Sequence, residues 1–268
     1  MLVRLFNLIN RFPAARRLLW KQVYRYLAGR FRDADWVYMN YGLAPLEGAE
    51  PLALDAADEP DRSWILLYHH VASAIDLRGR AVLEVGCGRG GGASFVKRTL
   101  GPATLVGVDI SDTAVALCRA RHQVAGLSFR QGDAEALPCA DASFDVVLNV
   151  ESSHCYGSLP RFLAEVRRVL KPGGHFLYAD FRGEADAATW FGDIAAAGLT
   201  ELGRTDITAR VLHALDADND RRMRLLERII PRILWPAFHQ FAAVPGSVIN
   251  REFRAGRASY LSFVLQRA

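Results

Sequence analysis

Short apolar runs recur through the middle of this 268-residue chain, and most of them end in glycine or in a carboxylate. An apolar run of this length without alternation is typical of a strand that is buried on both faces of a sheet. We therefore expect strands at residues 81–85, 103–109, 127–131, 143–150 and 175–180, followed by two more at 199–208 and 259–266.

Helical periodicity occupies the intervals between these runs. Helices are expected at 61–75, 93–100, 111–122 and 160–170, with a tight turn at 171–174. Alternating strands and helices joined by short turns predict an α/β fold with a doubly wound, Rossmann-like sheet. Its first five strands are expected to be parallel, and the last two bring the sheet to seven strands. Ligands of such sheets bind at the carboxyl ends of the strands.

A mostly helical excursion, residues 209–250, separates the last two expected strands. An insertion at this position is a natural place for an apolar lid over the ligand-binding edge. For any single residue of the excursion, ordinary packing against the sheet is an equally good interpretation. We assign this lid to a domain that spans residues 61–268.

Residues 1–60 differ from the rest, because residues 1–32 hold eight arginines and lysines, many leucines and aromatics, and no acidic residue. Pro13 divides that stretch into two expected helices. A basic helix with an apolar face can lie on an anionic membrane, or it can pack on the domain with its arginines in water. Residues 33–60 are expected to form a surface loop, whose aromatic residues either cover a ligand or anchor the loop to the core.

Composition and charge exclude some functions. A net charge of +4 does not require a nucleic-acid partner, and no aromatic-basic motif of a nucleic-acid module is present. Four widely spaced cysteines argue against a zinc cluster or a disulfide framework and fit a reducing cytoplasm. No apolar run is long enough to span a bilayer. We expect a cytoplasmic protein, associated with the inner face of the membrane if residues 1–32 bind lipid, and the sequence leaves its oligomeric state open.

The candidate chemistry begins at residues 84–92, where a strand runs into a glycine turn and a helix. Gly86, Gly88 and Gly91 match the dinucleotide fingerprint G-x-G-x-x-G. Glu84, Gly86, Gly88 and Gly90 match E-x-G-x-G-x-G, the pattern of class I S-adenosylmethionine (AdoMet) methyltransferases. Free N–H groups and the helix dipole make such a turn a cradle for either ligand, and an ordinary α/β turn is the third interpretation.

Acidic residues at later strand ends favour AdoMet. Asp109 ends the second strand, where a carboxylate reaches ribose hydroxyls in either class of protein. Asp133 ends the third strand, where it can accept a hydrogen bond from an adenine amino group, which a dinucleotide fold does not require. Asn149 and Asp180 stand at the ends of the fourth and fifth strands.

Taken together, these pieces resemble class I AdoMet-dependent methyltransferases over residues 61–268. The resemblance rests on the stretches 82–90, 108–109, 132–138, 144–147 and 170–174. More narrowly, stretches such as Leu148-Asn-Val-Glu-Ser-Ser-His-Cys-Tyr156 resemble mycobacterial phthiotriol/phenolphthiotriol dimycocerosate methyltransferases and related polyketide O-methyltransferases.

The resemblance implies AdoMet as the cofactor and assigns a set of binding residues. Gly86 and Gly88 would approach the methionine and ribose, Asp109 would hold the ribose hydroxyls, and Asp133 with Ala134 would hold the adenine. Ile110 and Leu137 would enclose the ring. The complete expected set is Glu84, Gly86, Gly88, Gly90, Asp109, Ile110, Asp133, Ala134 and Asn149.

His154 is the candidate general base, because an alcohol acceptor is a poor nucleophile and an imidazole is suited to neutral pH. Glu151, three residues earlier, would orient it. Alternatively, His154 only shapes the pocket. Tyr156 and Tyr178 are then the reserve candidates for the base. A Glu-x-x-His pair can also ligate a metal, but without further matched ligands we expect no metal site.

We therefore expect an AdoMet-dependent methyltransferase that modifies a small molecule, a hydroxyl oxygen of a lipid or polyketide product. The nearest alternative is a C-methyltransferase of the sterol or quinone type. A protein that binds AdoMet without methylating is a third interpretation, and a nicotinamide-dependent oxidoreductase is the least favoured.

Overall fold

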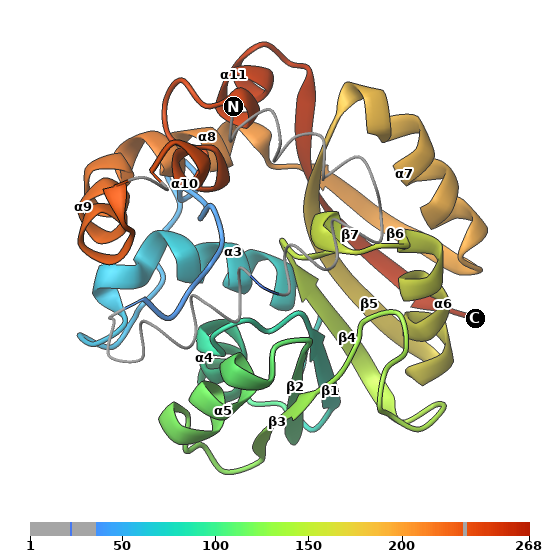
Figure 1. Ribbon diagram of the computed structural model, residues 1–268. Coiled ribbons are helices and arrows are strands. Elements are labelled where there is room, and N and C mark those ends of the chain that lie inside the picture. The colour runs from blue at the N-terminus through green and yellow to red at the C-terminus, as the bar shows by residue number, and fades with distance from the viewer. Residues whose placement is uncertain (1–21, 23–35, 233–234) are drawn as a thin grey trace.

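The computed structural model describes Gln22, residues 36–232 and residues 235–268 (Figure 1). The helices expected within residues 1–32, and their membrane contact, therefore lie outside the described residues except for Gln22. Residues 36–58 have no helix or strand, as expected for a loop. This loop nevertheless contributes buried side chains, among them Trp36, Tyr38 and Tyr41.

Seven strands form one sheet in the order β3-β2-β1-β4-β5-β7-β6. Their bounds are β1 Ala81–Val85, β2 Thr104–Asp109, β3 Leu127–Gln131, β4 Phe144–Val150, β5 Leu170–Gly183, β6 Leu199–Asp206 and β7 Ala258–Arg267. Every expected strand is present, which confirms the α/β, Rossmann-like class.

Helices alternate with these strands, as the periodicity predicts. They are η1 Glu59–Asp61, α3 Arg62–Ala72, α4 Gly91–Thr99, α5 Asp112–Arg121, η2 Ser153–Cys155, α6 Leu159–Val169, α7 Glu184–Ala196, α8 Thr208–Ala217, α9 Asn219–Ile229, α10 Trp235–Phe241 and α11 Val248–Arg254. Three of these described helices begin at side-chain caps. Ser111 accepts from the backbone N–H of Ala114, Ser158 from that of Arg161, and Ser247 from that of Asn250.

The parallel arrangement expected for the first five strands is confirmed. β1 to β5 are parallel, whereas β7 runs antiparallel to both β5 and β6. A strand that is buried on both faces has the same apolar pattern in either direction, so the sequence does not reveal its orientation. The sheet is therefore mixed.

The turn expected at 171–174 is part of β5. The register with β4 moves there from Phe144–Leu170 to Val146–His175, and Gly173 has a φ of 75°. The glycines thus form a bulge within a longer strand rather than a separate connection.

Two apolar layers enclose the sheet because alternate strand residues face opposite sides. Val82, Val146 and Leu148 pack with side chains of α3, α4, α5, α8 and α11. Leu83, Val147 and Phe176 pack with those of α6 and α7. Figure 1 shows α6 and α7 on one side of the sheet, with α3, α4 and α5 on the other.

The excursion between β6 and β7 holds helices α8 to α11. Val211, Leu215 and Phe253, from α8 and α11, are buried in the core, so these helices pack on the sheet. Figure 1 shows α9 and α10 farther from the strands, beside α8. Within the described residues, no helix combines the length and apolar character needed to cross a bilayer.

Candidate active site

A cavity of about 900 Å³ opens at the carboxyl ends of β1, β2 and β4. Its walls come from the turn after β1, the ends of β2 and β4, residues 132–135 and the loop before α3. Those walls include seven expected site residues: Gly86, Gly88, Asp109, Ile110, Asp133, Ala134 and Glu151. The sequence therefore predicted correctly which segments meet at this edge.

The glycine turn leaves its backbone open to the cavity. Gly86 and Gly88 have φ values of 76° and 52°, a region that favours glycine. A Cβ at Gly86 would lie 2.4 Å from the Ser152 hydroxyl oxygen, so no side chain fits between this turn and η2. The turn can thus bring a ligand against the main chain.

Asp109 fastens the turn to β2. Its Oδ2 accepts from the backbone N–H of Gly88 at 2.9 Å, and its Oδ1 accepts from that of Ser111 at 2.9 Å. Burial raises the pKa of Asp109 to about 6, although both hydrogen bonds oppose this rise. A neighbouring hydroxyl pair that donates to this carboxylate would favour its charged form.

Three expected binding residues are absent from the described cavity lining and support it from behind. Glu84 is fully buried, accepts from the Tyr68 hydroxyl at 2.8 Å, and has a pKa that burial raises to about 7. Gly90 caps α4 with a φ of 80°. Asn149 donates from Nδ2 to the Val85 carbonyl at 2.8 Å and to the Ser152 hydroxyl at 2.7 Å. Leu137 is also buried outside the described lining.

The loop before α3 supplies wall residues that the sequence assigned to no site. Tyr38, Met39 and Asn40 line the cavity, and Tyr68 of α3 joins them. The aromatic residues of this loop were the sequence signal that could have identified these wall residues. Tyr38 also packs on Trp64 and Tyr68, with ring centroids 6.3 and 6.0 Å apart, so the loop both covers the cavity and anchors to the core.

A second cavity, of about 580 Å³, adjoins the first and shares Tyr38, Met39, Asn40 and Glu151 with it. Its other described walls are Trp36, Tyr41, Trp64, His154, Arg222, Leu225 and Ala242. Because Arg222 and Leu225 belong to α9, the helical excursion reaches this cavity. The walls are largely aromatic and apolar, and their polar members include Glu151, His154 and Arg222.

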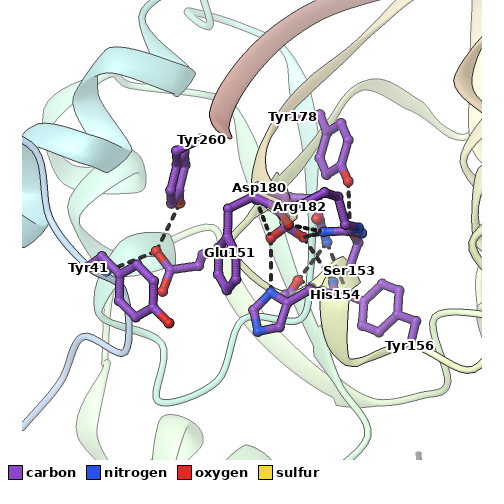
Figure 2. A network of polar contacts seen from close by, with 12 residues as sticks. Tyr41, Glu151, Ser153, His154, Tyr156, Tyr178, Asp180, Arg182 and Tyr260 are labelled. Atoms are coloured by element: carbon purple, nitrogen blue, oxygen red, sulfur yellow. Dashed lines mark hydrogen bonds and ion pairs between the residues drawn. The ribbon is translucent and has the colours of Figure 1, made fainter. Parts of the chain in front are cut away.

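Glu151 stands where the two cavities meet, at a φ of 50° that is unusual for a residue other than glycine. Its Oε2 accepts from the Tyr41 backbone N–H and the Tyr260 hydroxyl, both at 2.9 Å (Figure 2). Burial raises the pKa of Glu151 to about 8. The prediction that Glu151 orients His154 is therefore wrong, because its bonded partners are these two tyrosines.

Asp180 holds His154 instead. His154 Nδ1 lies 2.9 Å from Asp180 Oδ1, and the His154 backbone N–H donates to Oδ2 at 3.0 Å (Figure 2). Asp180 lies in β5, one residue beyond the last position paired with β4, and is fully buried, while the His154 side chain is 20% exposed. The other imidazole nitrogen, Nε2, points away from Asp180.

Asp180 is itself fixed by a polar network. The Ser153 hydroxyl donates to Oδ2 at 2.6 Å, and the Arg182 guanidinium lies 3.3 Å from the same oxygen. Ser153 also lies 2.5 Å from the Tyr178 hydroxyl. These contacts keep the buried carboxylate charged, and its pKa lies well below the usual range despite burial, because Arg182 and His154 are close.

The pKa of His154 reflects opposing influences. Burial lowers the pKa, but Cys155 and Asp180 outweigh that effect and raise it to about 10. The imidazole is therefore poised to carry a proton at neutral pH. This arrangement can bind an anionic group, or it can accept a proton once the ring is neutral.

AdoMet fits the first cavity on its own geometry. The Gly86 cradle excludes a Cβ, a half-buried carboxylate stands at Asp109, and Ile110 and Ala134 offer an apolar surface. Among the described residues, no cluster of three or more His, Cys, Asp or Glu side chains is placed to hold a metal ion.

Comparisons with known proteins agree with this arrangement. Residues 83–178 match a family described as a methyltransferase domain. The chain is 43% identical over 242 residues to the phthiotriol/phenolphthiotriol dimycocerosates methyltransferase of Mycobacterium tuberculosis, covering 90% of this chain and 89% of that protein. It is 45% identical over 216 residues to a fatty-acid O-methyltransferase of Mycolicibacterium smegmatis, covering 80% and 78%.

Solved structures share the fold. The [4+2]-cyclase SpnF matches with a TM-score of 0.68 and 22% identity over 92% of this chain and 94% of that one. A geranyl diphosphate methyltransferase in complex with AdoMet matches with a TM-score of 0.65 and 16% identity over 87% and 100%. With its glycine cradle, its strand-end carboxylates and its close curated relatives, the chain belongs to the AdoMet-dependent methyltransferases, in the family of the mycobacterial phthiotriol/phenolphthiotriol dimycocerosates enzymes.

Proposed function

We propose that this methyltransferase transfers a methyl group to an oxygen atom of a lipid or polyketide acceptor, and that His154 is its general base. The observation that carries this proposal is the His154–Asp180 pair at the wall of an aromatic cavity that adjoins the cofactor cavity. The relatives named for phthiotriol and fatty-acid substrates support a lipid acceptor.

In this proposal the first cavity binds the cofactor and the second cavity binds the acceptor. Gly86, Gly88 and Asp109 would hold the cofactor, with Asp133 and Ala134 at the adenine. When bound, AdoMet supplies an electrophilic methyl group and an excellent leaving group. The protein then mainly has to align the acceptor oxygen and exclude water. The second cavity suits that task, because Trp36, Tyr41 and Trp64 enclose it.

For a hydroxyl acceptor, His154 would remove the acceptor proton. Asp180 accepts the Nδ1–H, which leaves the Nε2 lone pair directed away from the carboxylate. General bases contribute about 10²–10⁴-fold to such reactions. Because the pKa of His154 is raised to about 10, the neutral imidazole that acts as a base becomes more abundant as the pH rises toward that value.

A carboxylate acceptor is the second candidate, and the raised pKa of His154 favours it. A carboxylate needs no base, and a protonated His154 would pair with it. The relative named a fatty-acid O-methyltransferase is consistent with this chemistry. Both candidates use the same cavity and differ in the charge that His154 must carry.

Transfer of label from methyl-labelled AdoMet to lipid and polyketide extracts tests the proposal. An alkali-stable methyl ether supports the hydroxyl acceptor, and an alkali-labile methyl ester supports the carboxylate. Label on carbon would replace the proposal with a C-methyltransferase. Tight AdoMet binding without any transfer would leave a non-methylating AdoMet-binding protein.

We also propose that the protein works in the cytoplasm, with residues 1–32 in peripheral contact with the inner face of the membrane. Eight basic residues without an acidic one, interleaved with leucine and aromatics, support this contact. Flotation with liposomes, with and without residues 1–32, measures it. Identical partitioning of the two chains would rule out a contribution from this segment.

A further inference from the structure

An open, basic depression of about 1280 Å³ lies outside the two inner cavities. Four of its walls are Arg121, Arg221, Arg224 and Arg228, which we call the arginine face. Arg121 ends α5, and the other three lie on α9. Among the described residues that line the depression, Asp61 is the one carboxylate, and it is paired with Arg221.

The spacing of the α9 arginines places them together. Positions 221, 224 and 228 are three and four residues apart, so their side chains project from one side of the helix. Asp220 and Glu227 lie farther round the same helix, next to Arg224 rather than among all three arginines. Arg121, Arg224 and Arg228 are exposed. The surface is therefore a positively charged patch bordered by acids.

This depression borders both inner cavities, because it shares one wall residue with each of them. Leu225 of α9 lines both the depression and the aromatic second cavity. Val37 lines both the depression and the cofactor cavity. The arginine face thus lies next to the cavity that is proposed to take the acceptor.

Charge decides what kind of partner fits here. An anionic surface complements the guanidinium groups of this face other than Arg221, whose charge Asp61 balances. A lipid acceptor has to leave such a surface to enter the protein. Residues 1–32 of the same chain carry eight positive charges and no negative ones, so like charge disfavours them as the occupant.

We propose that the arginine face docks on an anionic phospholipid bilayer and presents the approach at Leu225 and Val37 to the membrane. Its purpose rests on the proposed lipid acceptor, but docking itself is measured without any transfer. Arg224 and Arg228 would contact phosphate groups, while Leu225 marks the apolar path inward. The arginine face consists of other residues than 1–32, so the contributions of the two to membrane affinity would add.

Vesicle binding of the full-length chain tests the proposal. The vesicles contain one part phosphatidylglycerol to two parts phosphatidylcholine, with pure phosphatidylcholine for comparison. The variant is Arg224→Gln/Arg228→Gln, in which both substitutions retain good helix propensity. The matched control is Arg161→Gln/Arg167→Gln, two exposed arginines of α6, which Figure 1 shows on the far side of the molecule from α9.

The partition coefficient of the α9 variant on anionic vesicles should fall roughly 30-fold, while that of the α6 variant changes little. Added salt should weaken wild-type binding. AdoMet titration of both variants shows that they are folded. Equal binding by the two variants, or equal binding to neutral vesicles, would overturn the proposal. So would a selective loss of affinity for a random-sequence RNA oligomer with vesicle binding intact.

Discussion

Asp180, together with Cys155, raises the pKa of His154, and Asp180 accepts from Nδ1 at 2.9 Å inside the protein. A buried carboxylate beside an imidazole favours the protonated ring. Arg182 and Ser153 compete for the same carboxylate, which limits that effect. The behaviour of His154 is therefore a property of the network in Figure 2 rather than of the histidine alone.

The Asp180→Asn variant should lower the pKa of His154, because a neutral amide stabilises the imidazolium less. With a hydroxyl acceptor, wild-type kcat/KM should rise with pH as His154 loses its proton, up to a pKa of about 10. In the variant the midpoint of this rise should shift to lower pH. Glu50→Gln, which removes an exposed carboxylate from the loop before α3, is the control. An unchanged midpoint in Asp180→Asn would leave Asp180 with a purely structural role.

His154→Gln should lower kcat by about 10²–10⁴-fold on a hydroxyl acceptor, the usual contribution of a general base. Calorimetric affinity for AdoMet should stay nearly constant, since His154 is not among the described walls of the cofactor cavity. Full activity in this variant would remove the assignment of His154 as the base.

Glu84 makes the free energy of unfolding depend on pH. Its pKa rises from 4.5 to about 7 on folding, so between these values the folded state holds more protons. Stability should therefore fall as the pH rises through this window, by up to about 3 kcal/mol. Glu84→Gln can still accept from Tyr68. In this variant the free energy of unfolding, measured by urea titration at pH 5 and at pH 8, should differ less between the two pH values. An equal change in the free energy of unfolding between pH 5 and pH 8 in the wild type and the variant would contradict the raised pKa of Glu84.

At the scale of elements, the turn between β1 and α4 works because backbone replaces side chains there. Gly86 takes a left-handed φ and lies against Ser152 of the segment after β4, so two strand ends approach each other closely. The same glycines that matched the motif are those that the packing requires.

Gly86→Ala should therefore destabilise the protein by about 1–3 kcal/mol, through strain at a left-handed φ. The AdoMet affinity should also fall, because Ser152 or the turn must shift to accept the Cβ. Gly192→Ala in α7 is the matched control, since a Cβ there meets nothing within 4 Å. That control should gain roughly 0.5–1 kcal/mol. Thermal unfolding and AdoMet titration of both variants measure the contrast.

At the scale of the whole molecule, the helical excursion closes on the loop before α3. Arg222 of α9 is buried and donates to the carbonyls of Tyr41 and, at 3.3 Å, Ala242. It thereby joins three segments that enclose the second cavity. We propose that this closure makes residues 209–250 the lid of the acceptor site.

Arg222→Met should raise the KM for the acceptor and lower the thermal midpoint, because buried carbonyls lose their donors at about 1–3 kcal/mol each. The affinity for AdoMet should change little, since Arg222 borders only the second of the two inner cavities among the described residues. Arg251→Met on α11 controls for the loss of an exposed arginine. An unchanged acceptor KM would show that the excursion does not act as a lid.

The amino-acid sequence alone was enough to place Gly86, Asp109 and Asp133 at one ligand-binding edge. Their signals are local: an apolar run, a glycine turn and an acid at a strand end follow one another within a few residues. It was not enough for the strand direction of β7, for which both orientations share one apolar pattern.

Three-dimensional packing settled the partners of His154 and Glu151. Proximity in sequence suggested that these two residues pair, yet His154 bonds to Asp180, 26 positions away, and Glu151 to Tyr260, 109 positions away. No periodicity encodes such contacts, because they arise only when β4, β5 and β7 lie side by side in the sheet. Local sequence motifs therefore predict the cofactor, whereas contacts between residues distant in sequence determine the charge at the proposed acceptor site.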